Sequence, residues 1–448
     1  MVLRVPPVLM GLGAVAFRGA RQFTCGGCRM QGRVILTDAH GRSTVAATRC
    51  LAAHGYQVTA AAHGRPALAH WSRACHRRLW VPDPRTRARE FVEALAGAAG
   101  GDDGVVLLAG TDISLLVLSE HRDRLGTGVL TGLPDHETVL RALDKAGLAL
   151  AANGAGIASP PTIAVAHRAD APAAASELGY PVILKPRWAA YREAGRLTRR
   201  GGTLIASPAE FTAALPDFDD ELLLQRCEPG VVLSCAGATT GDRFLGLAVS
   251  RYERTWPAAA GNVSASMTVP PPRGLAEAAE RLVQALGWRG LFEIELIQHA
   301  DGSMTAIDFN PRIYGSLALS EAAGAPLAAL WCDWLTRARS PAAAVVARPG
   351  VRYRWEEAEA RNVAEALSAR RLWRVWATLR PRRKVARALF RRDDPGPLLA
   401  RAAFLAARLA NRAAHRLKRL PPPGEEALSG PPSAMARSWE TGSVDVEV

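Results

Sequence analysis

Two acidic segments in the second half of the chain carry the residues best suited to metal chemistry. Residues two apart in a β-strand share one face, so Glu293 and Glu295 point the same way. Asp308 and Asn310 do the same in the following segment. If the two strands pair, two or three carboxylates and an amide meet in one patch, where the like charges repel unless a cation lies among them. Oxygen-only ligands suit Mg²⁺ (or Mn²⁺), whereas the simpler interpretation is an acidic face turned to solvent.

Lysine is rare in this chain, which makes the few lysines informative. Only four of the 56 basic residues are lysine, and the other 52 are arginine. Lys145 is predicted on a helix, and Lys185 stands at the end of the apolar run Val182-Ile183-Leu184. A compact ammonium group in such a place can neutralise phosphate oxygens as a point charge.

A pair of glycines follows the second of these lysines. Gly201 and Gly202 are predicted to form a flexible loop whose backbone amides approach phosphates. An ordinary hairpin turn explains the same two residues equally well.

The elements around these residues alternate between strands and helices in the first third of the chain. Strands are predicted at 34–37, 56–60 and 104–109, with helices at 44–54 and 87–99, so an open parallel sheet is expected. The first strand is not followed by the Gly-x-Gly-x-x-Gly loop of dinucleotide-binding domains, which favours a domain on the substrate side.

Further along, the pattern changes to a helix at 138–151 and mostly antiparallel strands. Strands are predicted at 182–185, 221–225, 231–251, 291–298 and 304–309, with a helix at 274–286 before the acidic hairpin. After about Arg339 the composition shifts to Ala, Arg and Pro, and a domain boundary is expected there.

The order of these motifs resembles the ATP-grasp superfamily, in particular the large subunit of carbamoyl-phosphate synthase and its solitary relatives. The resemblance covers about residues 30–340 and implies an α/β (α+β) ATP-grasp fold preceded by a Rossmann-like domain. It rests on five motifs in the family's order: Lys145 before Gly-Ile-x-x-Pro-x-Thr, then Gly-Tyr-Pro-Val-Ile-Leu-Lys-Pro, a glycine loop, Leu-Leu-Leu-Gln-Arg-Cys-Glu-Pro-Gly, and Phe-Glu-Ile-Glu-Leu with Ile-Asp-Phe-Asn-Pro-Arg.

The resemblance implies a role for each matching residue. Lys145 and Lys185 match the pair that contacts the nucleotide phosphates, with Lys185 also near the purine, and Gly201 and Gly202 match the phosphate loop. By the same resemblance, the backbone of Gln225, Arg226 and Cys227 matches the hinge that reads adenine, and Glu295, Asp308 and Asn310 match the metal ligands. Arg312 matches the arginine that stabilises the transferred phosphoryl group, and Arg254 is the candidate to hold the substrate anion. Glu293 is expected to be a neighbour of the metal ligands.

Two positions depart from the family's pattern. Arg226 stands where the family usually has a glutamate, and the acid that holds the ribose is missing, so Glu228 is the candidate to replace it. Asp308 is one methylene shorter than the usual glutamate, a change that the shell of a hard cation can absorb.

The activity implied is that of an ATP-dependent carboxylate–amine ligase. A carboxylate attacks the γ-phosphorus of ATP, and an amine then displaces phosphate from the acylphosphate, with Mg²⁺ neutralising the triphosphate. One alternative is a small-acid kinase like carbamoyl-phosphate synthase, and another is a weakly catalytic nucleotide-binding protein at a membrane. The sequence does not identify the acid, the amine or the oligomeric state.

The net charge of +14 is concentrated near the C-terminus. Residues 368–420 hold 16 basic and two acidic residues, so the remainder of the chain is neutral. Leucines and alanines recur there at helical spacing, with arginines largely off that stripe, as in a helix on an anionic membrane or one packed on the protein body. We do not expect nucleic-acid binding, because no aromatic platform accompanies the basic residues.

The expected organisation has five parts. They are a leader or mis-assigned start (1–29), a Rossmann-like domain (30–135), the ATP-grasp domain (136–340), a basic helical extension (341–420) and a disordered tail (421–448). Seven scattered cysteines form no disulfide framework, and Cys25 and Cys28 lack a second pair to complete a metal site. A reducing cytoplasm is therefore expected, with peripheral membrane association as the alternative.

Overall fold

A computed structural model describes residues 31–418, apart from 194, 200, 215–220, 259–260 and 383–384. The predicted leader with Cys25 and Cys28, the predicted disordered tail and Lys384 lie outside the described residues. The domain boundaries predicted from the sequence remain predictions.

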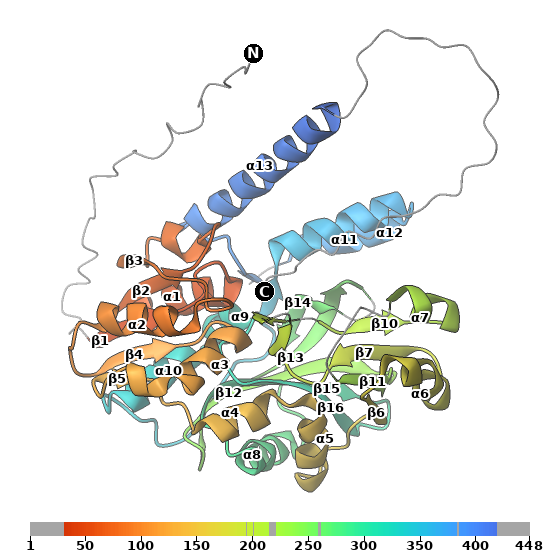
Figure 1. Ribbon diagram of the computed structural model, residues 1–448, viewed down its shortest axis with the longest axis horizontal. Coiled ribbons are helices and arrows are strands. Elements are labelled where there is room, and N and C mark those ends of the chain that lie inside the picture. Colours follow the sequence, from red (N-terminus) through yellow and green to blue (C-terminus); the bar gives the residue numbers. More distant parts are fainter. Residues whose placement is uncertain are drawn as a thin grey trace. The chain divides into compact units, whose positions relative to one another are not determined.

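The N-terminal part is a five-stranded parallel sheet in the order β3-β2-β1-β4-β5 (Figure 1). Val34, Ile35 and Leu36 of β1 are at most 1% exposed, as expected for a parallel strand covered on both faces. The order reverses at β1, so the carboxyl ends of β1 and β4 flank a crevice of the kind where open α/β sheets bind ligands. The elements are β1 (Gly32–Leu36), α1 (Arg42–Ala53), β2 (Tyr56–Ala62), β3 (Arg77–Trp80), α2 (Ala88–Ala99), β4 (Val105–Leu108), α3 (Asp112–Glu120) and β5 (Val129–Leu130).

The predicted helix over 138–151 is wrong in one respect, because the structure divides it in two. Asp144 adopts an extended backbone between α4 (His136–Leu143) and α5 (Lys145–Gly154), and it forms an isolated bridge with Trp188. Its carboxylate accepts from the amide of Ala146 at 3.0 Å and from the Arg187 guanidinium at 2.9 and 2.8 Å. Asp144 is thus an N-cap, which places Lys145 at the first residue of α5.

A smaller antiparallel sheet follows, in the order β10-β7-β11-β6. Its strands are β6 (Thr162–Val165), β7 (Val182–Pro186), β10 (Thr203–Ile205) and β11 (Leu222–Arg226), and α6 (Ala171–Leu178) and α7 (Pro208–Ala214) accompany them. A separate two-stranded ribbon, β8 (Tyr191–Glu193) with β9 (Arg196–Thr198), lies between β7 and β10 in the sequence.

The largest sheet has eight strands and contains the predicted acidic hairpin. The order is β16-β15-β12-β13-β14-β18-β19, with β17 paired to β13. The extension expected to be helical therefore also supplies three strands, since β17, β18 and β19 all come from it. The strands are β12 (Val231–Thr239), β13 (Phe244–Trp256), β14 (Asn262–Thr268), β15 (Gly290–Gln298), β16 (Met304–Asn310), β17 (Val345–Val346), β18 (Arg352–Arg354) and β19 (Val385–Arg387).

The parallel sheet and the large sheet share hydrophobic cores. One cluster joins Ile35 and Leu107 of the parallel sheet to Phe292 and Ile294 of β15. A second includes Leu36 together with Trp331 of α10 (Leu327–Leu335), and α10 contacts both α1 and β12. This shared packing fixes the carboxyl edge of the parallel sheet against the acidic hairpin. Two more helices complete the region, α8 (Leu275–Ala285) and α9 (Leu317–Ala322).

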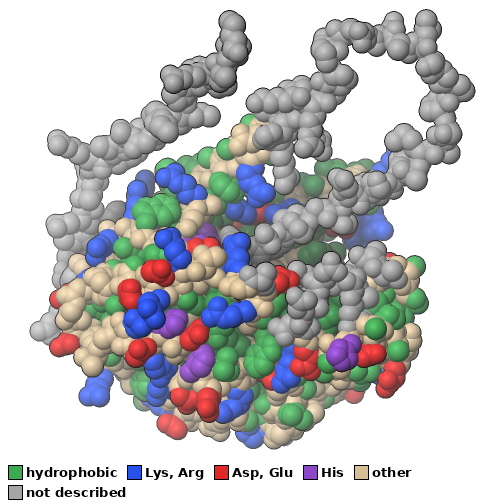
Figure 2. Space-filling view, viewed as in Figure 1, with side chains coloured by type: hydrophobic (Ala, Val, Ile, Leu, Met, Phe, Trp, Pro, Cys, Tyr) green, Lys and Arg blue, Asp and Glu red, His purple; other side chains and the backbone are tan. Residues whose placement is uncertain are grey.

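Three helices complete the extension: α11 (Glu356–Ser368), α12 (Leu372–Leu379) and α13 (Gly396–Lys418). The first turns of α13 pack on the body, where Leu398 is partly buried and Arg401 donates to both carboxylate oxygens of Glu357. Over the described ranges, we find no helix with the length and apolar character needed to cross a bilayer. Acidic and basic side chains intermix over the face drawn in Figure 2, in keeping with the neutral charge of the chain outside its C-terminal region.

Candidate functional site

The predicted acidic hairpin forms, and its register brings the expected ligands together. Glu295 of β15 lies opposite Asp308 of β16, and Glu293 lies opposite Asn310. The register then shifts, because Leu296 pairs with Ala306 and leaves Ile307 as an extra residue on β16. Such a bulge interrupts the ladder and redirects main-chain groups, here beside the paired carboxylates.

Glu295 and Asp308 have the unmet bonding capacity of a cation site. Among the described residues, Glu295 accepts a single hydrogen bond, from the Tyr252 hydroxyl at 2.6 Å. The Oδ1 atom of Asp308 is buried and accepts no hydrogen bond within the described structure, although Lys145 Nζ lies 3.3 Å away. Burial, followed by the charges of Glu293 and Asp308, raises the pKa of Glu295 to about 8. Oxygen-only ligands, with a Glu295 carboxyl that burial and neighbouring charges keep from ionising, fit Mg²⁺ or Mn²⁺.

Asn310 and Glu293 complete the patch in different ways. The Asn310 side chain accepts from Arg312 at 3.2 Å and donates to Glu293 at 3.3 Å, so its carbonyl oxygen keeps a second lone pair for a cation. Glu293 is 5% exposed, and its Oε1 accepts from the hydroxyls of Ser234 at 2.7 Å and Ser316 at 3.4 Å. Both carboxylate oxygens of Glu293 already accept hydrogen bonds, so Glu293 holds Asn310 in place and is not itself expected to be a ligand.

Lys185 reaches the hairpin from the smaller sheet. Its ammonium donates to the main-chain oxygen of Ile307 at 3.0 Å and to Gln225 Oε1 on the neighbouring β11, also at 3.0 Å. The Ile307 carbonyl belongs to the bulge residue, one position before Asp308. Burial, with the nearby charge of Lys145, lowers the pKa of Lys185 to about 8. The two sheets therefore meet at this ammonium group.

Lys145 reaches the same strand from the start of α5. Its ammonium lies 3.3 Å from Asp308 Oδ1 and 3.5 Å from Oδ2. The helix break at Asp144 sets this position, since the amide of Lys145 also donates to the main-chain oxygen of Arg187 at 2.9 Å. The two lysines chosen from composition therefore converge on one carboxylate strand.

Arg312 is held by an acid that the sequence interpretation missed. Its guanidinium donates to both oxygens of Asp112, at 2.6 and 3.1 Å, and Arg199 lies 3.0 Å from the same carboxylate. Arg312 is 6% exposed and Asp112 is 1% exposed. Burial opposes ionisation, yet Arg312 and Arg199 lower the pKa of Asp112. A signal existed, because Asp112 follows β4 at the carboxyl edge of the parallel sheet, where functional residues gather.

The predicted hinge lies at the end of β11. Gln225 also donates to the Thr162 hydroxyl at 3.1 Å, so its amide links β6 to Lys185. The main-chain amide of Arg226 donates to the oxygen of Pro161 at 2.9 Å, and that of Cys227 donates to Pro181 at 3.2 Å. The Arg226 side chain is exposed and bonds the Leu178 carbonyl, and Glu228 is partly buried. Adenine reading at this hinge remains a prediction.

The glycine pair lies close to Lys185 and is not a hairpin turn. The preceding β9 pairs with β8, whereas the following β10 pairs with β7, so Gly201 and Gly202 connect two different sheets. A Cβ placed on Gly202 would lie 3.7 Å from that of Lys185, and one placed on Gly201 would meet no described atom within 4 Å. Gly202 therefore lies beside the Cβ of Lys185, and a side chain at Gly201 would have room.

Arg254 lies on β13 and is bound by the extension. Its guanidinium donates to both oxygens of Glu359 on α11, at 3.1 and 2.5 Å, and Ser264 donates to the same carboxylate at 2.9 Å. These contacts do not join Arg254 to the carboxylate patch, although Tyr252, two residues earlier on β13, bonds Glu295. A role in holding the substrate anion stays a prediction.

Comparison with known proteins shows which known fold the chain resembles. No protein-family model matches the chain, and no curated protein matches it by sequence. Among solved structures, it is similar to N5-carboxyaminoimidazole synthetase from Staphylococcus aureus, with a TM-score of 0.53 and 15% identity over 70% of this chain and 80% of that one.

Two further structures extend the comparison. Carboxyaminoimidazole ribonucleotide synthase from Aspergillus clavatus, complexed with ATP, has a TM-score of 0.55 and 16% identity, over 71% of this chain and 80% of its own. L-amino acid ligase from Bacillus licheniformis has a TM-score of 0.52 and 14% identity, over 68% of this chain and 75% of its own. These likenesses show that the chain has the ATP-grasp fold, as the order of its motifs predicted.

Proposed function

We propose that this ATP-grasp chain is an ATP-dependent ligase that activates a small-molecule carboxylate as an acylphosphate for attack by an amine. The observation that carries the proposal is the meeting of Lys185 with the hairpin that pairs Glu295 and Asp308. Solved structures of the same fold include an L-amino acid ligase and a synthase complexed with ATP, which supports the class of reaction.

The residues divide the work by charge. Glu295, Asp308 and Asn310 would hold Mg²⁺, which supplies charge neutralisation at the β- and γ-phosphates of ATP. Lys185 and Lys145 offer ammonium groups to the same oxygens, and Arg312, fixed by Asp112, offers a guanidinium near the transferred phosphoryl group. Lys185 uses two of its three N–H donors within the described residues, so the third could bind a phosphate oxygen.

The reaction proceeds in two balanced steps. A carboxylate oxygen of the acid attacks the γ-phosphorus, the bond to the bridging oxygen breaks, and ADP leaves. The amine nitrogen then attacks the acyl carbon, and inorganic phosphate leaves with the electron pair of the C–O bond while the amine loses a proton. The protein contributes positioning and electrostatic stabilisation, since phosphoryl transfer needs little covalent assistance.

The test is acid-dependent release of ADP from ATP. Purified full-length protein is screened against amino acids, small acids and sugar acids, with and without an amine, beside the Lys185→Ala variant. ADP release that requires an acid and increases with an amine supports the ligase, whereas release with a small acid alone favours the kinase alternative. If no acid stimulates the protein above Lys185→Ala, catalysis by this site is excluded for the acids screened.

We also propose that α12 places the enzyme on an anionic lipid surface. Leu372, Trp373, Trp376 and Leu379 recur along this helix, and their side chains are 62% to 68% exposed. Basic residues surround them, at 370, 371, 374, 380 and 382, with no acid from 368 to 382. The tryptophan side chains suit the headgroup region of a bilayer in polarity. The arginines beside them suit its anionic lipids in charge.

Flotation with vesicles tests the lipid contact. Wild-type protein is expected to float with vesicles rich in phosphatidylserine and to remain behind with phosphatidylcholine alone. Trp373→Ser with Trp376→Ser should abolish flotation, while Trp71→Ser, which removes another exposed tryptophan, should not. Equal flotation of the double variant and the wild type would exclude α12 as the contact.

A further inference from the structure

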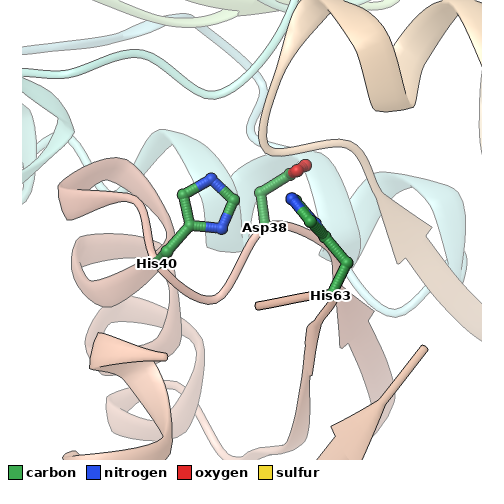
Figure 3. A group of neighbouring side chains, drawn as sticks. All are labelled: Asp38, His40 and His63. Carbon is green, nitrogen blue, oxygen red and sulfur yellow. The ribbon is translucent and has the colours of Figure 1, made fainter. Parts of the chain in front are cut away.

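A second group of ligand-type side chains lies on the parallel sheet, outside the acidic hairpin. Asp38 and His40 follow β1, and His63 follows β2. These two strands are parallel neighbours, with Leu36 beside Ala60, so the residues after them emerge at the same edge of the sheet. Figure 3 shows the three side chains turned toward one another from these two loops.

The three side chains can offer their ligand atoms to one point. One nitrogen from each imidazole and one oxygen from Asp38 all lie within 4.8 Å of one another. The two imidazole rings meet edge to face at 4.9 Å between centroids and an interplanar angle of 85°. Asp38 is buried while both histidines are partly exposed, so the group is anchored on one side and open on the other.

The loop that carries Asp38 is held in an uncommon conformation. Asp38 has a φ of +58°, a left-handed conformation that is uncommon for residues other than glycine. The hydroxyl of Thr37 donates to Asp38 Oδ2 at 2.5 Å and accepts from the amide of Gly110 at 2.9 Å. A Cβ at Gly110 would come within 2.8 Å of that of Asp38, so only glycine lets the β4 loop approach this closely. Thr37 therefore orients the carboxylate from behind, as supporting residues do in metal sites.

The chemistry of this group differs from that of the acidic hairpin. Two imidazoles and one carboxylate form a mixed nitrogen and oxygen set that suits Zn²⁺ and its neighbours among the transition metals, whereas Mg²⁺ prefers oxygen alone. Three protein ligands leave at least one coordination position, which the partly exposed side opens to solvent. We propose that Asp38, His40 and His63 bind a zinc ion that keeps an open coordination position.

Another group of metal-ligating residues provides a matched control. Cys50, His54 and Glu321 also lie within 4.8 Å of one another. Burial and then the charge of Glu321 raise the pKa of the Cys50 thiol well above its usual range, and His54 Nδ1 lies 2.8 Å from the Cys50 carbonyl oxygen. Cys50 is buried and His54 Nδ1 already contacts a main-chain oxygen, so we expect this group to bind zinc more weakly than Asp38, His40 and His63 do.

The experiment is a titration of chelator-treated, full-length protein with Zn²⁺ by isothermal titration calorimetry. All proteins carry Cys25→Ala with Cys28→Ala, so that the cysteine pair cannot bind zinc. Excess Mg²⁺ is present to occupy the oxygen site of the acidic hairpin. One zinc per chain is expected. His40→Ala with His63→Ala should weaken binding by roughly 100-fold or more, and Thr37→Val by about 10- to 100-fold. Circular dichroism verifies that each variant is folded.

The remaining variants separate this site from the others. His54→Ala, and Glu295→Gln with Asp308→Asn, should leave the zinc affinity unchanged. Replacing Zn²⁺ by Co²⁺ should give visible absorption bands that disappear in the two-histidine variant. The proposal is overturned if the parent protein, with Cys25 and Cys28 replaced, takes up no zinc, or if the two-histidine variant binds it as tightly as the parent.

Discussion

The ammonium group of Lys185 donates to the main-chain carbonyl oxygen of Ile307, with 3.0 Å between the two atoms. Lys185 belongs to the four-stranded sheet, and Ile307 is the bulge residue of β16 in the eight-stranded sheet. The bulge leaves this carbonyl free to accept beside Asp308. The contact therefore joins β7, which carries Lys185, to the hairpin that carries Glu295 and Asp308.

Removing the Lys185 ammonium should weaken nucleotide binding. In Lys185→Ala, the affinity for Mg·ATP is expected to fall by about 10- to 100-fold, because hydrogen bonds between charged groups contribute roughly 1.5–3 kcal/mol. Calorimetry with a non-hydrolysable ATP analogue measures the change. Arg89→Ala, which removes an exposed positive charge on α2, should bind as the wild type does. Equal affinities for the wild type and Lys185→Ala would remove Lys185 from the phosphate site.

Glu295 should make the stability of the metal-free protein depend on pH. Its pKa is about 8 in the folded protein against 4.5 for a free side chain. Between these values the folded state holds a proton that the unfolded state has lost, so the free energy of unfolding should fall as pH rises through this window. Urea denaturation in the presence of a chelator measures it. Glu295→Gln should flatten the dependence, and a wild-type protein that gains stability over this window would contradict the assignment.

The buried pair between Arg312 and Asp112 should be sensitive to loss of the acid. Asp112→Ala leaves the Arg312 and Arg199 guanidinium groups without their shared partner, and the free energy of unfolding should fall by about 3–5 kcal/mol. Chemical denaturation gives the value. The exposed pair of Arg124 with Glu93 is the control, where Glu93→Ala should cost roughly 0–1 kcal/mol. Similar losses of unfolding free energy in the two variants would show that the buried pair stabilises the fold no more than the exposed pair does.

Gly201 should matter for the nucleotide and not for folding. A Cβ there meets no described atom within 4 Å, so Gly201→Ala should change the free energy of unfolding by no more than about 0.5 kcal/mol. Its methyl group should still obstruct the approach of the loop amides to phosphates and weaken ATP binding several-fold. Gly97→Ala, on α2, has similar space and should leave ATP affinity unchanged. If Gly201→Ala binds ATP with unchanged affinity, this loop does not contact the phosphates.

The sequence predicted those parts of the site that depend on local pattern. Alternation along a strand placed Glu295 and Asp308 on matching faces, and strand pairing brought them opposite each other. The rarity of lysine selected Lys145 and Lys185, which converge on the same strand. The alternating strands and helices of the first third predicted the parallel sheet, because hydrophobic periodicity is a local property.

The parts that escaped prediction depend on contacts between distant residues. The break at Asp144 requires Arg187, 43 positions away, to bind the carboxylate that caps α5. The partner of Arg312 is 200 positions away, at the first residue of α3, and β17, β18 and β19 are strands because the large sheet offers them strands to pair with. Propensity and spacing carry no information on such partners.

The central claim is that Glu295 and Asp308 hold the divalent cation that accompanies ATP. The most direct measurement is electron paramagnetic resonance of Mn²⁺ titrated into the protein with a non-hydrolysable ATP analogue. In the wild type, the signal of free Mn²⁺ should decrease with about one or two ions bound per chain when the analogue is present. Glu295→Gln with Asp308→Asn should bind the ion no better than the analogue does alone. Wild-type Mn²⁺ binding in this double variant would contradict the account.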